Sequence, residues 1–147
     1  MTKSVISLCL LSLIILVSNA SAFTPLFVPD PVIRFTGQAP LKINGKDMIR
    51  YNYSVENAND FPKDMFAAAR DLPPCGKNKS SSRTWVDIYD QHGQRLYGFC
   101  ALNKPSDLHS LFFILEANAT PPSRVYIELN DRQTNKKYKS NLADTPL

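Results

Sequence analysis

Apolar and polar positions alternate over several short stretches of the chain. The clearest is residues 49–55, where apolar side chains at every second position alternate with polar or charged ones. A period of two is typical of an antiparallel strand with one face toward the core and the other toward water. The pair Asn44-Gly45, just before this stretch, is a strong signal for a tight hairpin turn.

Strand patterns recur along the rest of the chain with turn residues between them. They cover residues 32–35, 41–43, 47–55, 84–90, 94–102, 108–116, 124–129 and 137–141. One segment differs, because Phe61, Met65, Phe66 and Ala69 recur at helical spacing before the prolines at 73 and 74. Seven to eight short strands and one short helix predict an all-β fold, an antiparallel immunoglobulin-like β-sandwich.

Residues 84–102 predict the central hairpin of this sandwich. Two runs rich in β-branched and aromatic residues flank the tripeptide 91–93. Asp90 at the first turn position and Gly93 at the fourth favour a type I turn closed by a left-handed glycine, which gives a three-residue loop. This loop fixes the predicted pairing of the two strands, and a slip of one residue would regroup their faces.

The predicted pairing sorts the hairpin side chains into two faces. The first face holds Ile88 opposite Leu96, Val86 opposite Gly98, and Thr84 near Cys100. The second holds Trp85 opposite Phe99, Asp87 opposite Tyr97, and Tyr89 opposite Arg95. Four rings among polar groups make the second face our candidate binding face. Large apolar patches are uncommon on soluble monomers, so we expect the helix near Met65 and Phe66 to cover it; an open binding face is the alternative.

The first 22 residues have the pattern of an export signal. Lys3 gives a basic start, residues 5–17 are mostly apolar, and Ala20-Ser21-Ala22 is a small-residue cleavage site. We therefore expect a secreted or periplasmic protein whose single domain spans residues 23–147. The apolar run is too short for an ordinary membrane span and no later run is longer, so we expect no span after cleavage; a retained N-terminal anchor is the alternative.

Removal of the signal leaves two cysteines, Cys75 and Cys100. In an exported protein the default is a disulfide between them. Cys100 lies near the open end of the predicted hairpin, and Cys75 lies shortly before its first strand, so the loop between them can fold back. A redox pair or a metal site is the alternative, but the chain lacks a CxxC spacing and a convincing set of histidine partners.

The predicted mature chain is mildly basic. One of its 17 Lys and Arg residues lies in the signal, which leaves 16 against 13 acidic residues and a formal charge of +3. The only local cluster runs from Arg132 to Lys139, with Lys136, Lys137 and Lys139 around Tyr138. Charge runs usually mark solvated surface and edge strands favour lysine, so we expect a solvated hairpin end and no nucleic-acid site. A basic patch for nucleic acid or an anionic surface is the alternative.

Residues suited to catalysis are scarce. His92 and His109 are the only histidines, and both fall where we expect solvated loops. The chain has no glycine-rich phosphate loop, HExxH or GxSxG pattern. Asp87 and Asp90 lack the dense run of spaced carboxylates that a calcium loop needs. We therefore expect a protein that is not an enzyme and has neither a cofactor nor a metal.

Three Asn-x-Ser/Thr triplets begin at Asn52, Asn78 and Asn118. They would accept glycans only in a eukaryotic secretory pathway. Asn78 and Asn118 are the better candidates because they fall in predicted loops.

Residues 51–62, an alternating strand followed by an exit loop, resemble immunoglobulin-like or fibronectin type III-like extracellular modules. The groups 72–76, 83–90 and 96–100 are similar to the signature of a small exported family. Trp85 lies between two cysteines, as in true immunoglobulin domains, but Cys75 and Cys100 are only 25 positions apart and bracket adjacent strands. A disulfide between the two sheets is therefore not expected. The resemblance implies a binding or adhesion module.

The sequence therefore favours a non-catalytic module that binds a protein partner outside the cytoplasm. The main alternative is a carbohydrate-binding module that uses the aromatic hairpin face. A third class is an inhibitor of a secreted enzyme, for which residues 76–82 are the only candidate loop.

Overall fold

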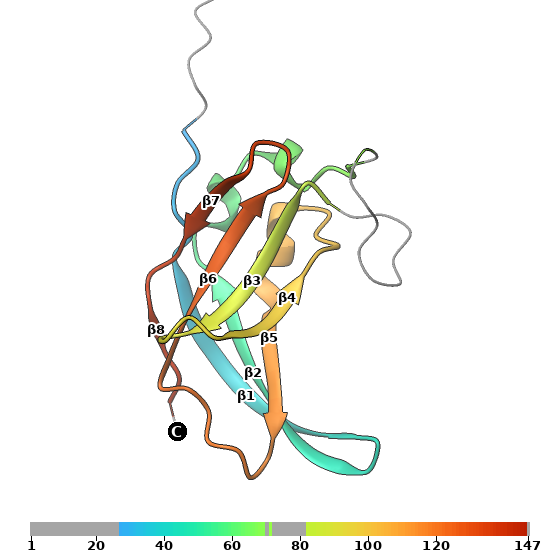
Figure 1. Cartoon of the computed structure of the whole chain (residues 1–147), viewed down its shortest axis with the longest axis vertical. Helices are drawn as coiled ribbons and strands as arrows, with labels where there is room; N and C mark the ends of the chain where they lie inside the picture. The colour runs from blue at the N-terminus through green and yellow to red at the C-terminus, as the bar shows by residue number, and fades with distance from the viewer. Residues whose placement is uncertain (1–26, 70, 72–81, 147) are drawn as a thin grey trace, which may run out of the picture.

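The computed structural model describes residues 27–69, 71 and 82–146, and their strands form two antiparallel sheets (Figure 1). The first sheet has the order β1-β2-β5, with β1 (Ile33–Ile43), β2 (Lys46–Val55) and β5 (Leu111–Glu116). The second has the order β4-β3-β6-β7, with β3 (Thr84–Asp90), β4 (Arg95–Phe99), β6 (Arg124–Asp131) and β7 (Lys136–Lys139); β8 (Ala143–Asp144) also pairs with β6. These eight strands confirm the predicted all-β sandwich.

The core lies between the two sheets and is built from alternate residues of their strands. Tyr53 and Val55 on β2 and Val86 and Ile88 on β3 are 0% exposed. Burying one such apolar side chain stabilises the fold by about 1.5–3 kcal/mol. The residues between them in sequence are less buried, so each sheet also has an outer face.

Three 3-10 turns close one end of the core: η1 (Ala58–Asp60), η2 (Lys63–Phe66) and η3 (Pro105–Ser110) (Figure 1). The helix predicted around Met65 and Phe66 is present as the short turn η2, and both side chains are buried in the core. The turn η3 replaces the start of the strand predicted from residue 108. The carboxylate of Asp107 favours this turn because it accepts the backbone N–H groups of Asn103 (2.8 Å) and Lys104 (3.2 Å).

The β1–β2 hairpin is longer than the sequence predicted. Its turn is as expected, with positive φ at both Asn44 (51°) and Gly45 (80°). The two short strands predicted at 32–35 and 41–43 join into one strand. Gly37, at a φ of 141°, follows a register shift, and Pro40 is tolerated because β1 is an edge strand that needs no N–H there.

The turn of the central hairpin is also as predicted. Gly93 has a φ of 86°, and its N–H donates to the carbonyl of Asp90 (3.1 Å). The N–H of Asp90 in turn donates to the carbonyl of Gln94 (2.9 Å). A left-handed glycine therefore closes the three-residue loop between β3 and β4.

Beyond this turn the predicted register is wrong by one residue. Tyr89 pairs with Arg95 as predicted, but Ile88 pairs with Tyr97 instead of Leu96. Leu96 is the extra residue of a β-bulge in β4.

The bulge lets β4 bury more apolar surface than a regular strand would. Leu96 and Phe99 are three positions apart, so in a regular strand they would point to opposite faces. In the bulged strand both pack against the core. Val86 consequently pairs with Phe99, and Asp87 pairs with Gly98.

Several predicted features lie outside the described residues: the export signal at 1–22, Cys75, Asn78, and all of the loop 76–82 except Ser82. The Cys75–Cys100 disulfide therefore stays a prediction. Nowhere in the described ranges is a helix long and apolar enough to cross a membrane.

Candidate binding face

The outer face of the second sheet is formed mainly by two neighbouring strands. Along β3, outward side chains alternate with the buried Thr84, Val86 and Ile88. The pairing of β3 with β6 sets each of them beside an outward residue of β6. We call this set the outer aromatic face; it consists of Trp85, Asp87 and Tyr89 on β3 and Asn130, Glu128 and Tyr126 on β6.

Basic side chains lie over the rings of this face. The rings of Tyr89 and Tyr126 stack with centroids 5.3 Å apart and planes 16° from parallel. The guanidinium of Arg132 lies 3.9 Å from the centroid of Trp85, and the ammonium of Lys139 lies 3.9 Å from the centroid of Tyr126. Each cation–π contact contributes about 0.5–2 kcal/mol, depending on how far it is removed from water. Trp85 and Tyr89 remain half-buried rather than fully covered.

Asp87 is held by two partners. Its carboxylate accepts a hydrogen bond from Nε of Arg95 (2.7 Å) and one from the side-chain amide of Asn130 (3.2 Å). Arg95 reaches Asp87 across Gly98, and a Cβ at Gly98 would collide with the guanidinium. Burial and the negative charges of Asp87 and Glu128 raise the pKa of Tyr89.

Glu128 is also paired. Lys137 on β7 donates to its carboxylate at 3.3 Å, and this hydrogen bond is the main cause that raises the pKa of Lys137. The two carboxylates of the outer aromatic face are therefore both bound to basic side chains.

The indole N–H of Trp85 is an exception to this pairing. Its nitrogen is buried, yet among the described residues it finds no hydrogen-bond acceptor. Leaving a buried donor unpaired costs about 1–3 kcal/mol. Because this nitrogen is itself buried, a partner at the surface reaches it only if the atoms that cover it move.

Four of the six predicted face residues lie together in the structure. Trp85, Asp87, Tyr89 and Arg95 are on the outer face of the second sheet. The bulge moves Tyr97 and Phe99 away from them, which corrects the prediction for these two residues.

Tyr97 and Phe99 join a separate aromatic cluster at the edge where β4 approaches β5. Their ring centroids are 5.0 Å apart, and each lies within 5.3 Å of the centroid of Phe112. The guanidinium of Arg50 lies 3.9 Å from the centroid of Phe112. This cluster covers the seam between the two sheets, and Tyr97 is 41% exposed.

The predicted cover of the hairpin face is also wrong. Met65 and Phe66 lie on the core side of β3, where the hydroxyl of Thr84 donates to the carbonyl of Met65 (2.7 Å). They therefore close the end of the core and do not lie over Trp85. The cations of Arg132 and Lys139 instead lie over Trp85 and Tyr126 of the outer aromatic face.

Sequence reasoning did not include the contribution of β6. Tyr126, Glu128 and Asn130 occupy the positions between Val125, Ile127 and Leu129, whose shared face the alternation does predict. The same alternation places the three on the outer face. What the sequence did not reveal is that β6 lies beside β3.

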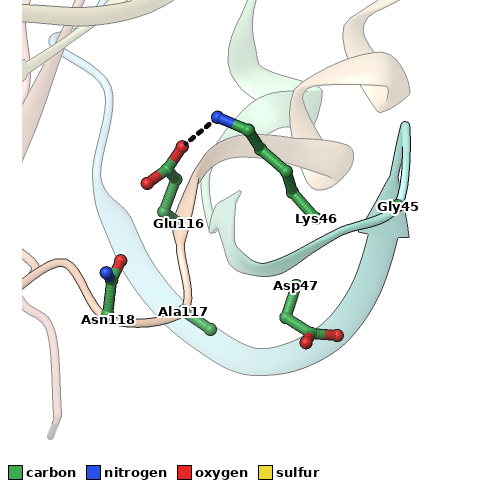
Figure 2. A pocket seen from close by; sticks show the side chains of 6 residues that line it. All are labelled: Gly45, Lys46, Asp47, Glu116, Ala117 and Asn118. Carbon is green, nitrogen blue, oxygen red and sulfur yellow. Dashed lines mark hydrogen bonds and ion pairs between the residues drawn. The ribbon is translucent and has the colours of Figure 1, made fainter.

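A hollow of about 490 Å³ lies at the tip of the β1–β2 hairpin, beside the end of β5 (Figure 2). Lys46 and Glu116 point toward one another across it and form an ion pair at 2.8 Å. This hydrogen-bonded pair raises the pKa of Lys46 and lowers that of Glu116. Asp47, which also lines the hollow, pairs with Lys42 at 2.6 Å. The charged residues that line this hollow are therefore paired, Lys46 with Glu116 and Asp47 with Lys42.

The histidines lie at the surface. His92 is exposed in the β3–β4 turn, and Nδ1 of His109 in η3 lies 3.0 Å from the hydroxyl of Ser54. The described residues contain no group of three or more His, Cys, Asp or Glu side chains placed to hold a metal ion.

Two of the three glycosylation triplets fall in the described residues. Asn52 lies within β2, where its side-chain amide donates to the carbonyl of Gly37 (3.2 Å). Asn118 is exposed in the turn after β5.

The chain matches no protein-family model, no curated protein and no solved structure. The functional interpretation therefore rests on the geometry of the outer aromatic face.

Proposed function

We propose that this chain is an exported, non-catalytic binding module that engages a protein partner outside the cytoplasm through the outer aromatic face. The observation that carries the proposal is the row of rings and paired charges on the outer side of β3 and β6, in which Trp85 and Tyr89 are half-buried and Tyr126 is buried. The core is closed without these side chains, so folding alone does not account for a Trp and two stacked Tyr at this position.

The covering of the rings supports a protein partner over a sugar. Arg132 and Lys139 occupy ring faces of Trp85 and Tyr126, and a stacked sugar would have to displace them. Protein interfaces, in contrast, are enriched in Trp, Tyr and Arg and use mixed aromatic and charged contacts.

A carbohydrate-binding module is the second candidate function. Asp87, Glu128 and Asn130 offer hydrogen-bonding groups beside the rings, which is the pattern that sugar hydroxyls require. Inhibition of a secreted enzyme through residues 76–82 is a third proposal, which none of the described contacts supports.

Export and the fold family belong to the same proposal. The pattern at residues 1–22 supports secretion or passage to the periplasm. A Cys75–Cys100 disulfide would then tie the segment before β3 to the end of β4.

The sheet orders β1-β2-β5 and β4-β3-β6-β7, with successive strands divided between two sheets, support an immunoglobulin-like or fibronectin type III-like module.

Position-specific photo-crosslinking tests this function. A benzophenone side chain at Tyr89 samples the outer aromatic face, and one at the exposed Ala39 samples the other sheet. In the extracellular fluid of the source, we expect crosslinking of a defined protein from position 89 and not from 39, and its loss when Trp85→Ala is added. Equal crosslinking from both positions, or none from 89, would overturn the proposal. Glycan binding that requires Trp85 would favour the second candidate instead.

A further inference from the structure

We infer that the protein partner is acidic and that it docks where the outer aromatic face meets the β6–β7 turn. This inference rests on the proposed function, because it names the class of partner for the same face. We call this region the basic end; its cationic residues are Arg132, Lys136, Lys137 and Lys139.

The basic end contains a hollow that could receive an acidic side chain. It measures about 410 Å³ and is lined by Asn130, Asp131, Arg132, Asn135, Lys136 and Lys137. Three of its six lining residues are basic, and only one is acidic. The hollow adjoins Trp85, since Arg132 both lines it and lies over the indole ring.

The acidic residue of this hollow is already neutralised from inside the protein. Both oxygens of Asp131 accept hydrogen bonds from Arg83, at 2.7 and 2.6 Å, and Thr134 donates to it at 2.7 Å. Asp131 is 2% exposed, so it contributes little negative charge to the surface. Glu128, the nearest carboxylate on β6, is paired with Lys137.

Two of the lysines have no carboxylate partner within the described residues. Lys136 is exposed at the start of β7, and Lys139 contacts the ring of Tyr126 instead of an acid. Exposed ammonium groups without an acidic partner fit carboxylates, which neutralise their charge and accept their hydrogen bonds.

Protection of an edge strand explains only part of this arrangement. Lysines on β7 discourage pairing with a second sheet, as expected for an edge. That role requires neither a hollow nor an arginine that extends the positive charge over the neighbouring Trp85. Charge complementarity with an acidic protein segment accounts for both.

Binding of octaglutamate labelled with fluorescein, followed by anisotropy at about 0.1 M salt, where the Debye length is about 10 Å, tests the inference. The triple variant Lys136→Gln, Lys137→Gln, Lys139→Gln should weaken binding about tenfold, as the loss of three modest surface attractions would. The control is Arg34→Gln, Lys42→Gln, Lys46→Gln, which removes the same charge from the first sheet and should change the affinity less than about twofold, since distant surface charges are screened. Thermal unfolding establishes that both variants are folded.

Equal weakening in the two triple variants, or no binding of octaglutamate to the unmodified protein, would overturn the inference. A heparin fragment and vesicles containing anionic lipid serve as competitors of other classes. If either binds through the three lysines while octaglutamate does not, the partner is not an acidic protein. Photo-crosslinking from position 89 is a separate experiment. If octaglutamate binding fails, the crosslinking result still tests whether the outer aromatic face binds a protein.

Discussion

The guanidinium of Arg132 lies 3.9 Å from the ring centroid of Trp85, on the outer surface of the second sheet. These two residues join the aromatic and the basic parts of the candidate binding face. Arg132 thus acts as a partial cover for the only tryptophan of the chain.

Removal of this cover should expose the indole ring. We expect Arg132→Ala to increase quenching of Trp85 fluorescence by acrylamide, a neutral quencher that does not respond to the lost charge. The free energy of unfolding should fall by about 0.5–1 kcal/mol, the value of an exposed cation–π contact. Arg34→Ala, on the opposite sheet, is the control and should leave quenching unchanged. Equal quenching in the unmodified protein, Arg132→Ala and Arg34→Ala would show that Arg132 does not cover the ring in solution.

The buried pair of Arg83 and Asp131 should dominate the stability of the β6–β7 end. Asp131→Asn leaves the part-buried guanidinium of Arg83 with the exposed Asp64 (3.1 Å) as its carboxylate partner in the described residues, so we expect a loss of about 2–3 kcal/mol in urea unfolding. Asp47→Asn, which removes an exposed pair with Lys42, should cost less than about 1 kcal/mol. Similar losses in the two variants would contradict the account of the buried pair.

The same pair predicts a dependence on acid pH. Burial alone would raise the pKa of Asp131, but hydrogen bonds from Arg83, Thr134 and the Gln133 amide outweigh it and lower the pKa from 3.8 to about 2. A lowered pKa means stability that is present above pH 3.8 and lost as the pH falls toward 2. The stability difference between the unmodified protein and Asp131→Asn should therefore shrink over that interval. A difference that stays constant would argue against the pairing.

Tyr53 predicts the opposite dependence at alkaline pH. Burial raises the pKa of Tyr53 to about 12, although the hydrogen bond with Thr145 (2.6 Å) acts in the other direction. A raised pKa means stability that is complete below pH 10 and lost as the pH rises toward 12. Tyr53→Phe should cost about 1 kcal/mol at neutral pH by removing that hydrogen bond. The difference in the free energy of unfolding between the unmodified protein and Tyr53→Phe should narrow above pH 10. Urea unfolding at several pH values measures this difference.

The bulge at Leu96 can be tested by nuclear Overhauser effects. The structure predicts cross-strand backbone contacts between Ile88 and Tyr97 and between Val86 and Phe99. Contacts of Ile88 with Leu96 and of Trp85 with Phe99 would instead indicate the regular register predicted from the sequence. In that case Tyr97 and Phe99 would belong to the outer aromatic face after all.

The features that the sequence predicted correctly depend on neighbouring residues. Asn44-Gly45 and Gly93 specify their turns because few other residues adopt positive φ at low cost. The alternation in residues 49–55 requires only that one face of β2 be buried. The loop length after Asp90 likewise set the first pair of the central hairpin.

The features that the sequence missed depend on contacts between distant segments. The bulge exists because Leu96 and Phe99 both find space in a core to which β5 and β6 contribute, and no local pattern reveals that space. Tyr126 entered the site only because β6 lies beside β3. The turn η3 depends on capping by Asp107, which competed with the strand pattern that follows it.

The most direct test of the central claim is the indole N–H resonance of Trp85 during titration with the protein crosslinked from position 89. Because the chain has a single tryptophan, this resonance reports on the outer aromatic face alone. If the face is the binding site, the resonance shifts or broadens together with the backbone signals of β3 and β6. An unchanged indole resonance, while signals elsewhere shift, would place the binding site on another surface and contradict the account.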